Sequence, residues 1–152
     1  EATAVENKLI KDKAYSIADN VTYPLLPPVA KEEVPYLDFS PLQNAVNELQ
    51  KNADSLSSYM SNTSLTDAEK NLLNTKLYQA EQQLLTKDGL PRRGWYRHTI
   101  YAPGFYTGYG VKTLPGIREA IEQRNWKEAQ EQISITANAI NKFSAYLGSA
   151  IK

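Results

Sequence analysis

Apolar residues recur along most of the chain at the three- and four-residue steps of an α-helix. The clearest stripe lies in residues 41–61 and is made by Leu42, Val46, Leu49, Ala53, Leu56 and Met60. Such alternating steps place the side chains on one face, so we expect a helix of about five turns that forms one seam of a bundle. Ser40 is placed to cap this helix, with Pro41 at its first position.

Two further segments of the N-terminal half have helical spacing. Residues 66–85 open with Thr66-Asp67-Ala68-Glu69, which has the form of a capping box, and continue with an inner stripe of Leu73, Leu77, Ala80 and Leu84. Residues 1–20 show a weaker helical pattern. Residues 21–40 hold four prolines, and we interpret them as a connector because proline removes backbone donors and disfavours helix in its predecessor.

The C-terminal helix carries more apolar surface than one buried face requires. Asn125 is its expected cap, and the helix is predicted from Trp126 to Leu147 or Gly148, after a short helix that begins at Pro115. Its second stripe consists of Ile135, Ala139 and Tyr146. Either the helix is central in the bundle, or this stripe also contacts another polypeptide. The predicted fold is all-α and resembles a four-helix bundle.

Residues 88–114 form a long connection that is rich in aromatic residues and glycine. Residues 92–110 read RRGWYRHTIYAPGFYTGYG. A connection of this length is usually functional or disordered, and disorder would leave much apolar ring surface in water. Tyrosine suits surfaces that are half buried against something else. We therefore expect an ordered loop that is presented to a partner or ligand, the alternative being a loop that merely covers the bundle.

Composition excludes several classes of function. The chain has 152 residues, which fits one domain, and 17 basic residues balance 17 acidic ones. This balance predicts neither a nucleic-acid partner nor a membrane contact. His98 is the only histidine and cysteine is absent, so no metal-ligand set and no catalytic constellation is apparent, and we expect no cofactor. We expect His98 to hydrogen-bond to the backbone or to a carboxylate, and Arg92, Arg93 and Arg97 to pair with carboxylates.

Several segments resemble a known family. They are Leu90-Pro91, WYRHTIYAP at 95–103 followed by a Gly/Tyr loop, LPGIREAI at 114–121 and, more loosely, SIADNVTYPLLP at 16–27. They are similar to the C-terminal dimerisation domain of the transferrin receptor and glutamate carboxypeptidase II family. The resemblance implies a non-catalytic homodimerisation domain of a larger protein, over residues 1–152. An upstream domain of the same protein would hold two zinc ions and perform a carboxypeptidase- or aminopeptidase-like hydrolysis. It also implies an extracellular, secretory or vacuolar protein, with or without a membrane anchor upstream.

The resemblance also implies roles for single residues of the loop. The 104–112 segment would help to close the substrate cleft, with Tyr106, Gly108 and Tyr109 at the substrate. Tyr109 matches a family tyrosine that binds the substrate's α-carboxylate, whereas the adjacent family lysine is replaced by Gly108, which predicts weaker selection for a terminal glutamate. Structural roles in the loop would belong to Tyr96, Arg97, His98, Tyr101 and Pro103. Apart from the resemblance, the second apolar stripe of the C-terminal helix makes Ile135, Ala139 and Tyr146 our candidates for the dimer interface. Two other interpretations stay open: a receptor-like protein without activity, and a free-standing module that binds a peptide or sugar.

Overall fold

The computed structural model describes residues 1–17 and 26–151, which fall into two units, before and after the boundary between Tyr36 and Leu37. In the first unit, α1 (Ala2–Lys11) and α2 (Ala14–Ile17) replace the single helix expected over residues 1–20. The helix breaks because Lys13 takes a left-handed conformation with φ of 55°. Residues 18–20 of that prediction lie outside the described residues. The Asn7 side chain donates to the Lys31 carbonyl and accepts from its N–H, which ties α1 to the extended segment.

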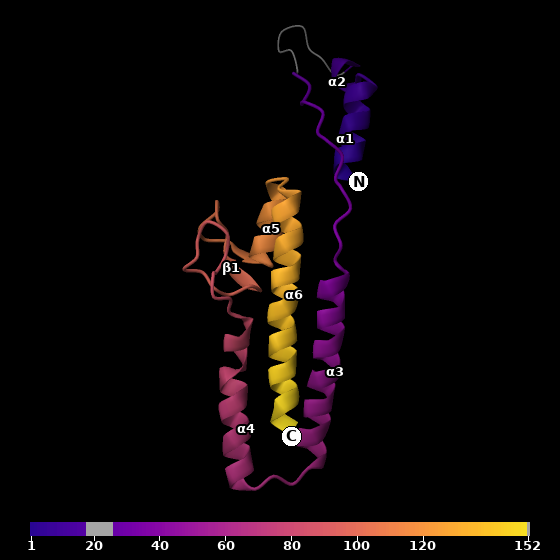
Figure 1. Ribbon diagram of the computed structural model, residues 1–152. Coiled ribbons are helices and arrows are strands. Elements are labelled where there is room, and N and C mark those ends of the chain that lie inside the picture. The colour runs from indigo at the N-terminus through magenta and orange to yellow at the C-terminus, as the bar shows by residue number, and fades with distance from the viewer. Residues whose placement is uncertain (18–25, 152) are drawn as a thin grey trace. The chain divides into compact units, whose positions relative to one another are not determined.

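The second unit is built around its last helix. Its elements are α3 (Ser40–Asn62), α4 (Asp67–Ala80) with the 3-10 turn η1 (Glu81–Leu84), β1 (Tyr101–Pro103), β2 (Val111–Thr113), α5 (Pro115–Glu122), α6 (Trp126–Gly148) and the turn η2 (Ser149–Ile151). The helix α6 packs against α3, α4 and α5 (Figure 1). The prediction of an all-α protein is confirmed, since the paired strands are only three residues each.

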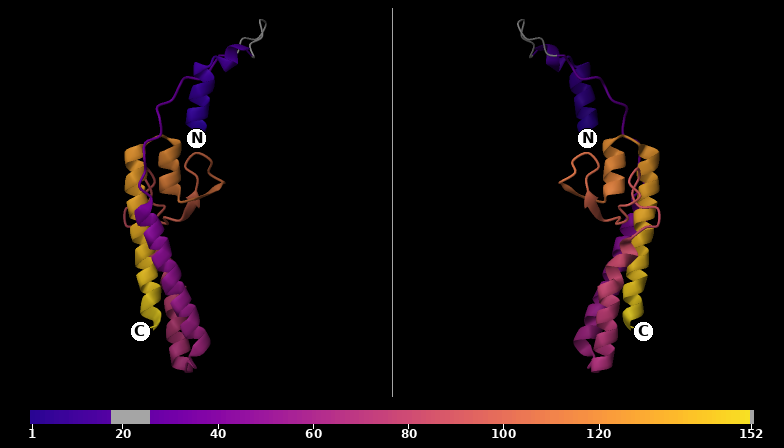
Figure 2. Two further views of the ribbon diagram at one scale, coloured as in Figure 1. Left: turned by 90° about the vertical axis from the view of Figure 1, so that its right-hand side faces the viewer. Right: turned by 90° about the vertical axis from the view of Figure 1, so that its left-hand side faces the viewer.

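Small side chains let α3 approach α6 closely. Ala45 of α3 forms a buried cluster with Ala137 and Ile140 of α6, and Asn52 Nδ2 donates to Ser144 Oγ at 2.8 Å across the same contact. A second buried cluster joins three helices through Leu56, Leu73, Ala80 and Leu147. Figure 2 shows α3 and α4 as one layer, with α6 along one side of it. The central position of α6 explains much of its additional apolar surface.

Two of the three predicted helix caps are confirmed. The Thr66 hydroxyl accepts from the Glu69 N–H and the Glu69 carboxylate accepts from the Thr66 N–H, as a capping box requires. Asn125 Oδ1 accepts from the Glu128 N–H at the start of α6. The cap predicted for α3 is wrong by position: Ser40 lies inside the helix, and its N–H donates to the Asp38 carboxylate instead.

The stripe predicted for α3 divides into two rows. Leu42 packs against the first cluster, Leu56 belongs to the second, and Leu49 packs against both. Val46 and Met60 are instead 44% and 48% exposed. On a helix of 3.6 residues per turn, residues three and four apart are offset by roughly 40–60° around the axis, so the two rows of the stripe do not point in the same direction. One row therefore faces the core while the other remains at the surface.

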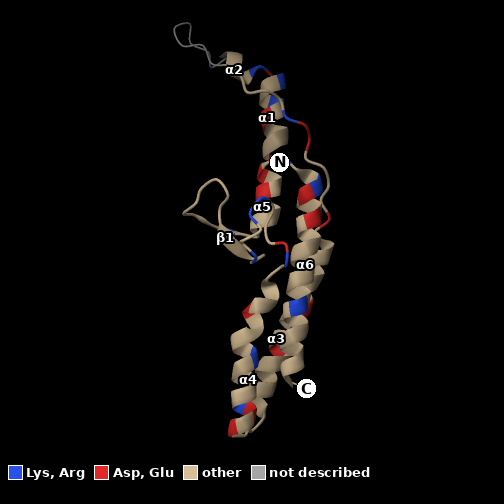
Figure 3. Cartoon of the chain, turned by 60° about the vertical axis from the view of Figure 1, so that its left-hand side comes forward, with Lys and Arg blue, Asp and Glu red and all other residues tan. Residues whose placement is uncertain are grey.

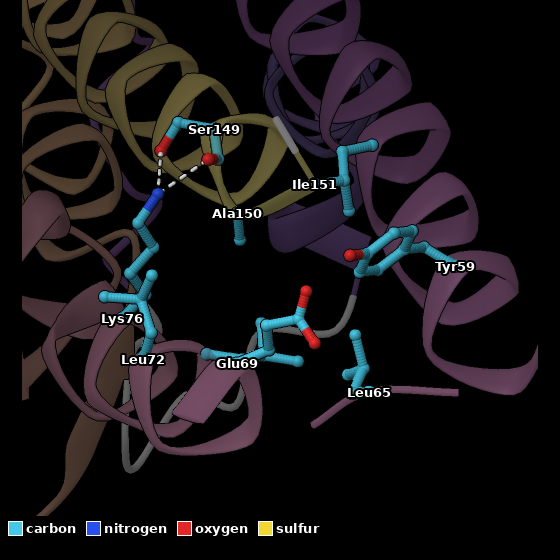
Figure 4. Close-up of a pocket in the computed structure, with 9 residues that line it drawn as sticks. Tyr59, Leu65, Glu69, Leu72, Lys76, Ser149, Ala150 and Ile151 are labelled. Carbon is cyan, nitrogen blue, oxygen red and sulfur yellow. Dashed lines mark hydrogen bonds between the residues drawn. The ribbon is translucent and has the colours of Figure 1, made fainter. Parts of the chain in front are cut away.

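The C-terminal turn is held by a lysine of α4. Lys76 Nζ donates to the carbonyl of Ser149 at 2.6 Å and contacts its hydroxyl at 3.4 Å (Figure 4). Figure 4 also shows Tyr59, Glu69 and Ile151 around a pocket of about 220 Å³ between α3, α4 and η2. This contact directs the Lys76 ammonium group toward the C-terminal turn and links α4 to η2.

Candidate functional site in the aromatic loop

The loop expected over residues 88–114 is an ordered hairpin with its own short strands. The strands β1 and β2 are antiparallel, with Tyr101 opposite Thr113 and Pro103 opposite Val111. These two strands were not predicted from the sequence. Pro103 fits because the strands end there, where a missing N–H donor costs least. We call residues 86–103 the base of the loop and residues 104–110 its tip.

A buried ion pair stabilises the base. Arg93 Nη2 lies 2.7 and 2.8 Å from the two carboxylate oxygens of Glu119 in α5, and both side chains are only 3% exposed. Arg93 Nη1 donates to the Pro103 carbonyl, and the Phe105 N–H donates to Glu119 at 2.8 Å. One carboxylate thus accepts from the base and from the first residues of the tip, which satisfies its charge in a buried setting.

Two further carboxylates of the C-terminal helices hold the loop. Arg92 makes a two-pronged contact with Glu128 of α6, at 2.8 and 2.9 Å. Lys112, in β2, donates to Glu122 of α5. The prediction that the arginines pair with carboxylates is therefore confirmed for Arg92 and Arg93. Arg97 contributes its backbone carbonyl instead, which accepts from the Thr86 N–H at 2.9 Å.

His98 is bound to the backbone, as expected. Its Nδ1 accepts from the N–H groups of Ile100 and Tyr101, both at 3.3 Å, so we assign the ring proton to Nε2. Burial lowers the pKa of His98, and the Glu81 carboxylate, 3.5 Å from Nε2, opposes this shift. The Tyr101 hydroxyl donates to Glu81 at 2.7 Å, which raises the pKa of Tyr101. The neutral imidazole serves the hairpin as an acceptor.

The tip is a tight turn whose outward residues are exposed. The Gly104 N–H donates to the Gly110 carbonyl and the Gly108 N–H to the Gly104 carbonyl, at 2.9 and 3.0 Å. Gly108 has a φ of 64°, a conformation that glycine adopts without strain. The Tyr109 side chain follows it and is fully exposed. The hairpin therefore presents a tyrosine to its surroundings at a position that the backbone fixes.

The residues predicted for substrate contact and those predicted for loop structure fall in different parts of the hairpin. Tyr106, Gly108 and Tyr109 gather at the tip, all exposed. The base and β1 hold Tyr96, whose carbonyl accepts from the Leu90 N–H, with Arg97, His98, Tyr101 and Pro103. The three α6 residues separate: Ala139 is buried, Tyr146 packs on the second core cluster, and Ile135 is 38% exposed. Of these three, Ile135 has the most surface to offer a second chain.

Sequence reasoning missed Glu119, which organises the site. Its signal is a single acidic residue between Ile117, Ala120 and Ile121 on a short apolar helix. A carboxylate among buried aliphatic residues implies a buried partner of opposite charge. The sequence does not say which residue pairs with Glu119, because the loop holds three arginines and their spacing favours none of them. The fold selects Arg93.

Comparison with known proteins identifies the family. The model of the transferrin receptor-like dimerisation domain matches residues 37–148. The chain belongs to this family. A probable glutamate carboxypeptidase of Arabidopsis thaliana is 39% identical over 82 residues, covering 49% of this chain and 12% of that protein. One of Arthroderma benhamiae is 31% identical over 124 residues, covering 80% of this chain and 17% of that protein.

A third similar protein carries a different description. A putative zinc metalloprotease of Saccharomyces cerevisiae is 30% identical over 80 residues, covering 47% of this chain and 10% of that protein. The chain spans less than a fifth of the length of each of these relatives. It is thus a dimerisation domain of the kind found in glutamate carboxypeptidase-like proteins. Within the part of the chain that the structure describes, no group of three or more histidine or acidic side chains is placed to hold a metal, and no helix is long and apolar enough to cross a membrane.

Proposed function

We propose that this chain is the homodimerising, non-catalytic domain of a glutamate carboxypeptidase-like zinc metallopeptidase. In this proposal the two zinc ions and the hydrolysis belong to an upstream peptidase domain, and the 104–112 segment helps to close its substrate cleft. The observation that carries the proposal is Tyr109, a fully exposed tyrosine on a hairpin whose base is held by Arg93 and Glu119. A binding group held on a rigid base loses little freedom when it meets a ligand.

The chemistry offered by the tip is a neutral hydroxyl. Tyr109 would donate a hydrogen bond to the α-carboxylate of a peptide substrate, together with contacts from Tyr106. Gly108 supplies no charge beside it, and Lys112 is engaged by Glu122. A substrate side-chain carboxylate would therefore lack a cation from the tip, a charge-assisted contact worth about 1.5–3 kcal/mol. We expect a peptidase that does not strictly require a terminal glutamate.

The test uses the whole peptidase that carries this domain. Tyr109→Phe removes one hydroxyl and keeps the ring, so we expect KM to rise roughly tenfold with a smaller change in kcat. Tyr96→Phe makes the same chemical change in the base and serves as the matched control. A KM that Tyr109→Phe leaves at the wild-type value would contradict the role of the loop. A strong preference for peptides ending in glutamate over alanine or leucine would contradict the specificity.

A further inference from the structure

The turn between α3 and α4 contains an acceptor triplet for N-linked glycosylation. Asn62, Thr63 and Ser64 form an Asn-X-Ser triplet without proline in the middle position, as this modification requires. A second such triplet, Asn20-Val21-Thr22, lies outside the described residues. Because three-residue motifs also arise by chance, the structure around Asn62 decides if the triplet is usable.

The backbone leaves the helix within the triplet. Asn62 is the last residue of α3, and Thr63 is extended, with φ of −113° and ψ of 126°. Residues 63–66 then lead to α4 without regular secondary structure. Helix ends fray readily, so an enzyme that binds the triplet in an extended form has to unwind only the end of α3.

The side chain of Asn62 is available for reaction. Asn62, Thr63 and Ser64 are all exposed. Within the part of the chain that the structure describes, the Asn62 amide makes no hydrogen bond. Asn52 of the same helix shows the contrast, because its Nδ2 donates to Ser144 Oγ at 2.8 Å. The Asn62 amide therefore gives up no contact of the fold when it is modified.

The surroundings of Asn62 leave room for a large group. Ser58 and Ser55 precede Asn62 by four and seven residues and thus share its side of α3, and both are small and exposed. Residues 63–66 carry no charged side chain (Figure 3). The turn lies at the end of the bundle away from β1 and α5 (Figure 1), so a glycan there would not obstruct the hairpin.

We propose that Asn62 carries an N-linked glycan in the whole protein. Its Nδ2 attacks the anomeric carbon of an oligosaccharide that is linked to a lipid diphosphate. A carbon–nitrogen bond forms, the bond from that carbon to the diphosphate oxygen breaks, an amide proton passes to a base of the transferase, and the lipid diphosphate leaves. The Ser64 hydroxyl is the group that the transferase recognises. The proposal requires passage through a secretory compartment and is independent of the role proposed for Tyr109.

A glycan at Asn62 has a consequence for the assembled protein. It is bulky and strongly hydrated, so it occupies surface positions only. The α3–α4 turn would therefore stay in solvent in the whole protein. Contacts with other domains or chains would use the remainder of the bundle and the hairpin.

The experiment locates glycans on the whole protein, purified from its own source. Trypsin releases residues 52–70 as one peptide, and peptide N-glycosidase in heavy-oxygen water converts a glycosylated asparagine to a labelled aspartate. We expect the label at Asn62 by mass spectrometry. Asn52 is the internal control, because Asp54 stands where the triplet needs a hydroxyl, and a digestion without the glycosidase measures spontaneous deamidation.

Two variants of the whole protein sharpen the test. Ser64→Ala keeps Asn62 but removes the triplet, so we expect complete loss of the label. Ser61→Ala removes a neighbouring hydroxyl outside the triplet and should leave the label unchanged. Circular dichroism checks that both variants keep the helicity of the wild type.

The contrary outcomes are distinct. An unlabelled Asn62 in protein whose Asn20 is labelled overturns the site, because that protein has met the transferase. Protein without label at either triplet overturns the proposal through its compartment. A label that survives Ser64→Ala overturns the role of the triplet. None of these results bears on the substrate contact proposed for Tyr109, which the kinetics of Tyr109→Phe test separately.

Discussion

The base and the tip of the aromatic loop are only a few residues apart, yet they are held in opposite ways. In the base, Arg93 and Glu119 form a buried ion pair that also binds Pro103 and Phe105. In the tip, backbone hydrogen bonds between glycines define the turn, and Tyr109 is fully exposed. The comparison shows how a helical bundle can present an exposed aromatic group at a defined position: rigidity comes from side chains in the base, and accessibility from glycines in the tip.

Removal of the base's ion pair is the strongest way to break this arrangement. Arg93→Ala leaves the Glu119 carboxylate buried without its cation, so we expect the free energy of unfolding to fall by about 3–5 kcal/mol. Urea denaturation followed by circular dichroism measures it. Arg92→Ala is the control, because the Arg92–Glu128 pair is partly exposed and should cost about 1 kcal/mol or less. Equal losses for the two variants would mean that Arg93 does not organise the base.

Two glycines with similar φ angles sharpen the comparison. Gly89 lies in the base with φ of 67°, and a Cβ there would overlap the carbonyl of Gly94. Gly108 lies in the tip with φ of 64°, and a Cβ there would meet nothing within 4 Å. We expect Gly108→Ala to cost about 1 kcal/mol, from backbone strain alone, and Gly89→Ala to cost clearly more. The difference between their urea midpoints measures the close packing of the base, and its absence would contradict that packing.

The base should also respond to pH through His98. Burial lowers its pKa below the ordinary value of 6.5, so the unfolded state binds the proton more readily than the folded state. The neutral form's contribution is complete above pH 6.5 and is lost as the pH falls through that value toward the folded pKa. Thermal unfolding of wild type and His98→Gln from pH 7.5 to 5.5 measures this. A difference in Tm between wild type and His98→Gln that stays the same from pH 7.5 to 5.5 would argue against a neutral His98.

The smallest effect on stability is expected at the tip. Tyr109→Ala removes a side chain that lies in solvent, so the free energy of unfolding should change by no more than about 0.5 kcal/mol. Calorimetry of the 152-residue chain provides the measurement. A larger loss of the free energy of unfolding would show that the Tyr109 side chain packs against its own domain. That result would favour a loop that covers the bundle over one that is presented to a partner.

The long elements and their starts could be predicted from local chemistry. The capping box at Thr66 and the Asn125 cap are confirmed because their hydrogen bonds join residues three apart in sequence. The prediction of helix starts and ends was less accurate where the local sequence preference did not match the backbone conformation of the folded chain. The Ser40 cap was wrong by one position because α3 already begins at Ser40, whose own N–H donates to Asp38. The helix expected over residues 1–20 breaks at Lys13.

The sequence by itself determined that the protein is helical, where its aromatic loop lies and which family motifs the loop contains, because these depend on spacing and residue type. The tertiary structure decided that Arg93, rather than Arg92 or Arg97, is the buried partner of Glu119. It also decided that Val46 and Met60 stay at the surface while Ala139 is covered. These outcomes depend on which helices pack together and on how each helix is rotated about its axis. The free energy of that packing comes from contacts between residues far apart in sequence, so a local sequence pattern does not predict it.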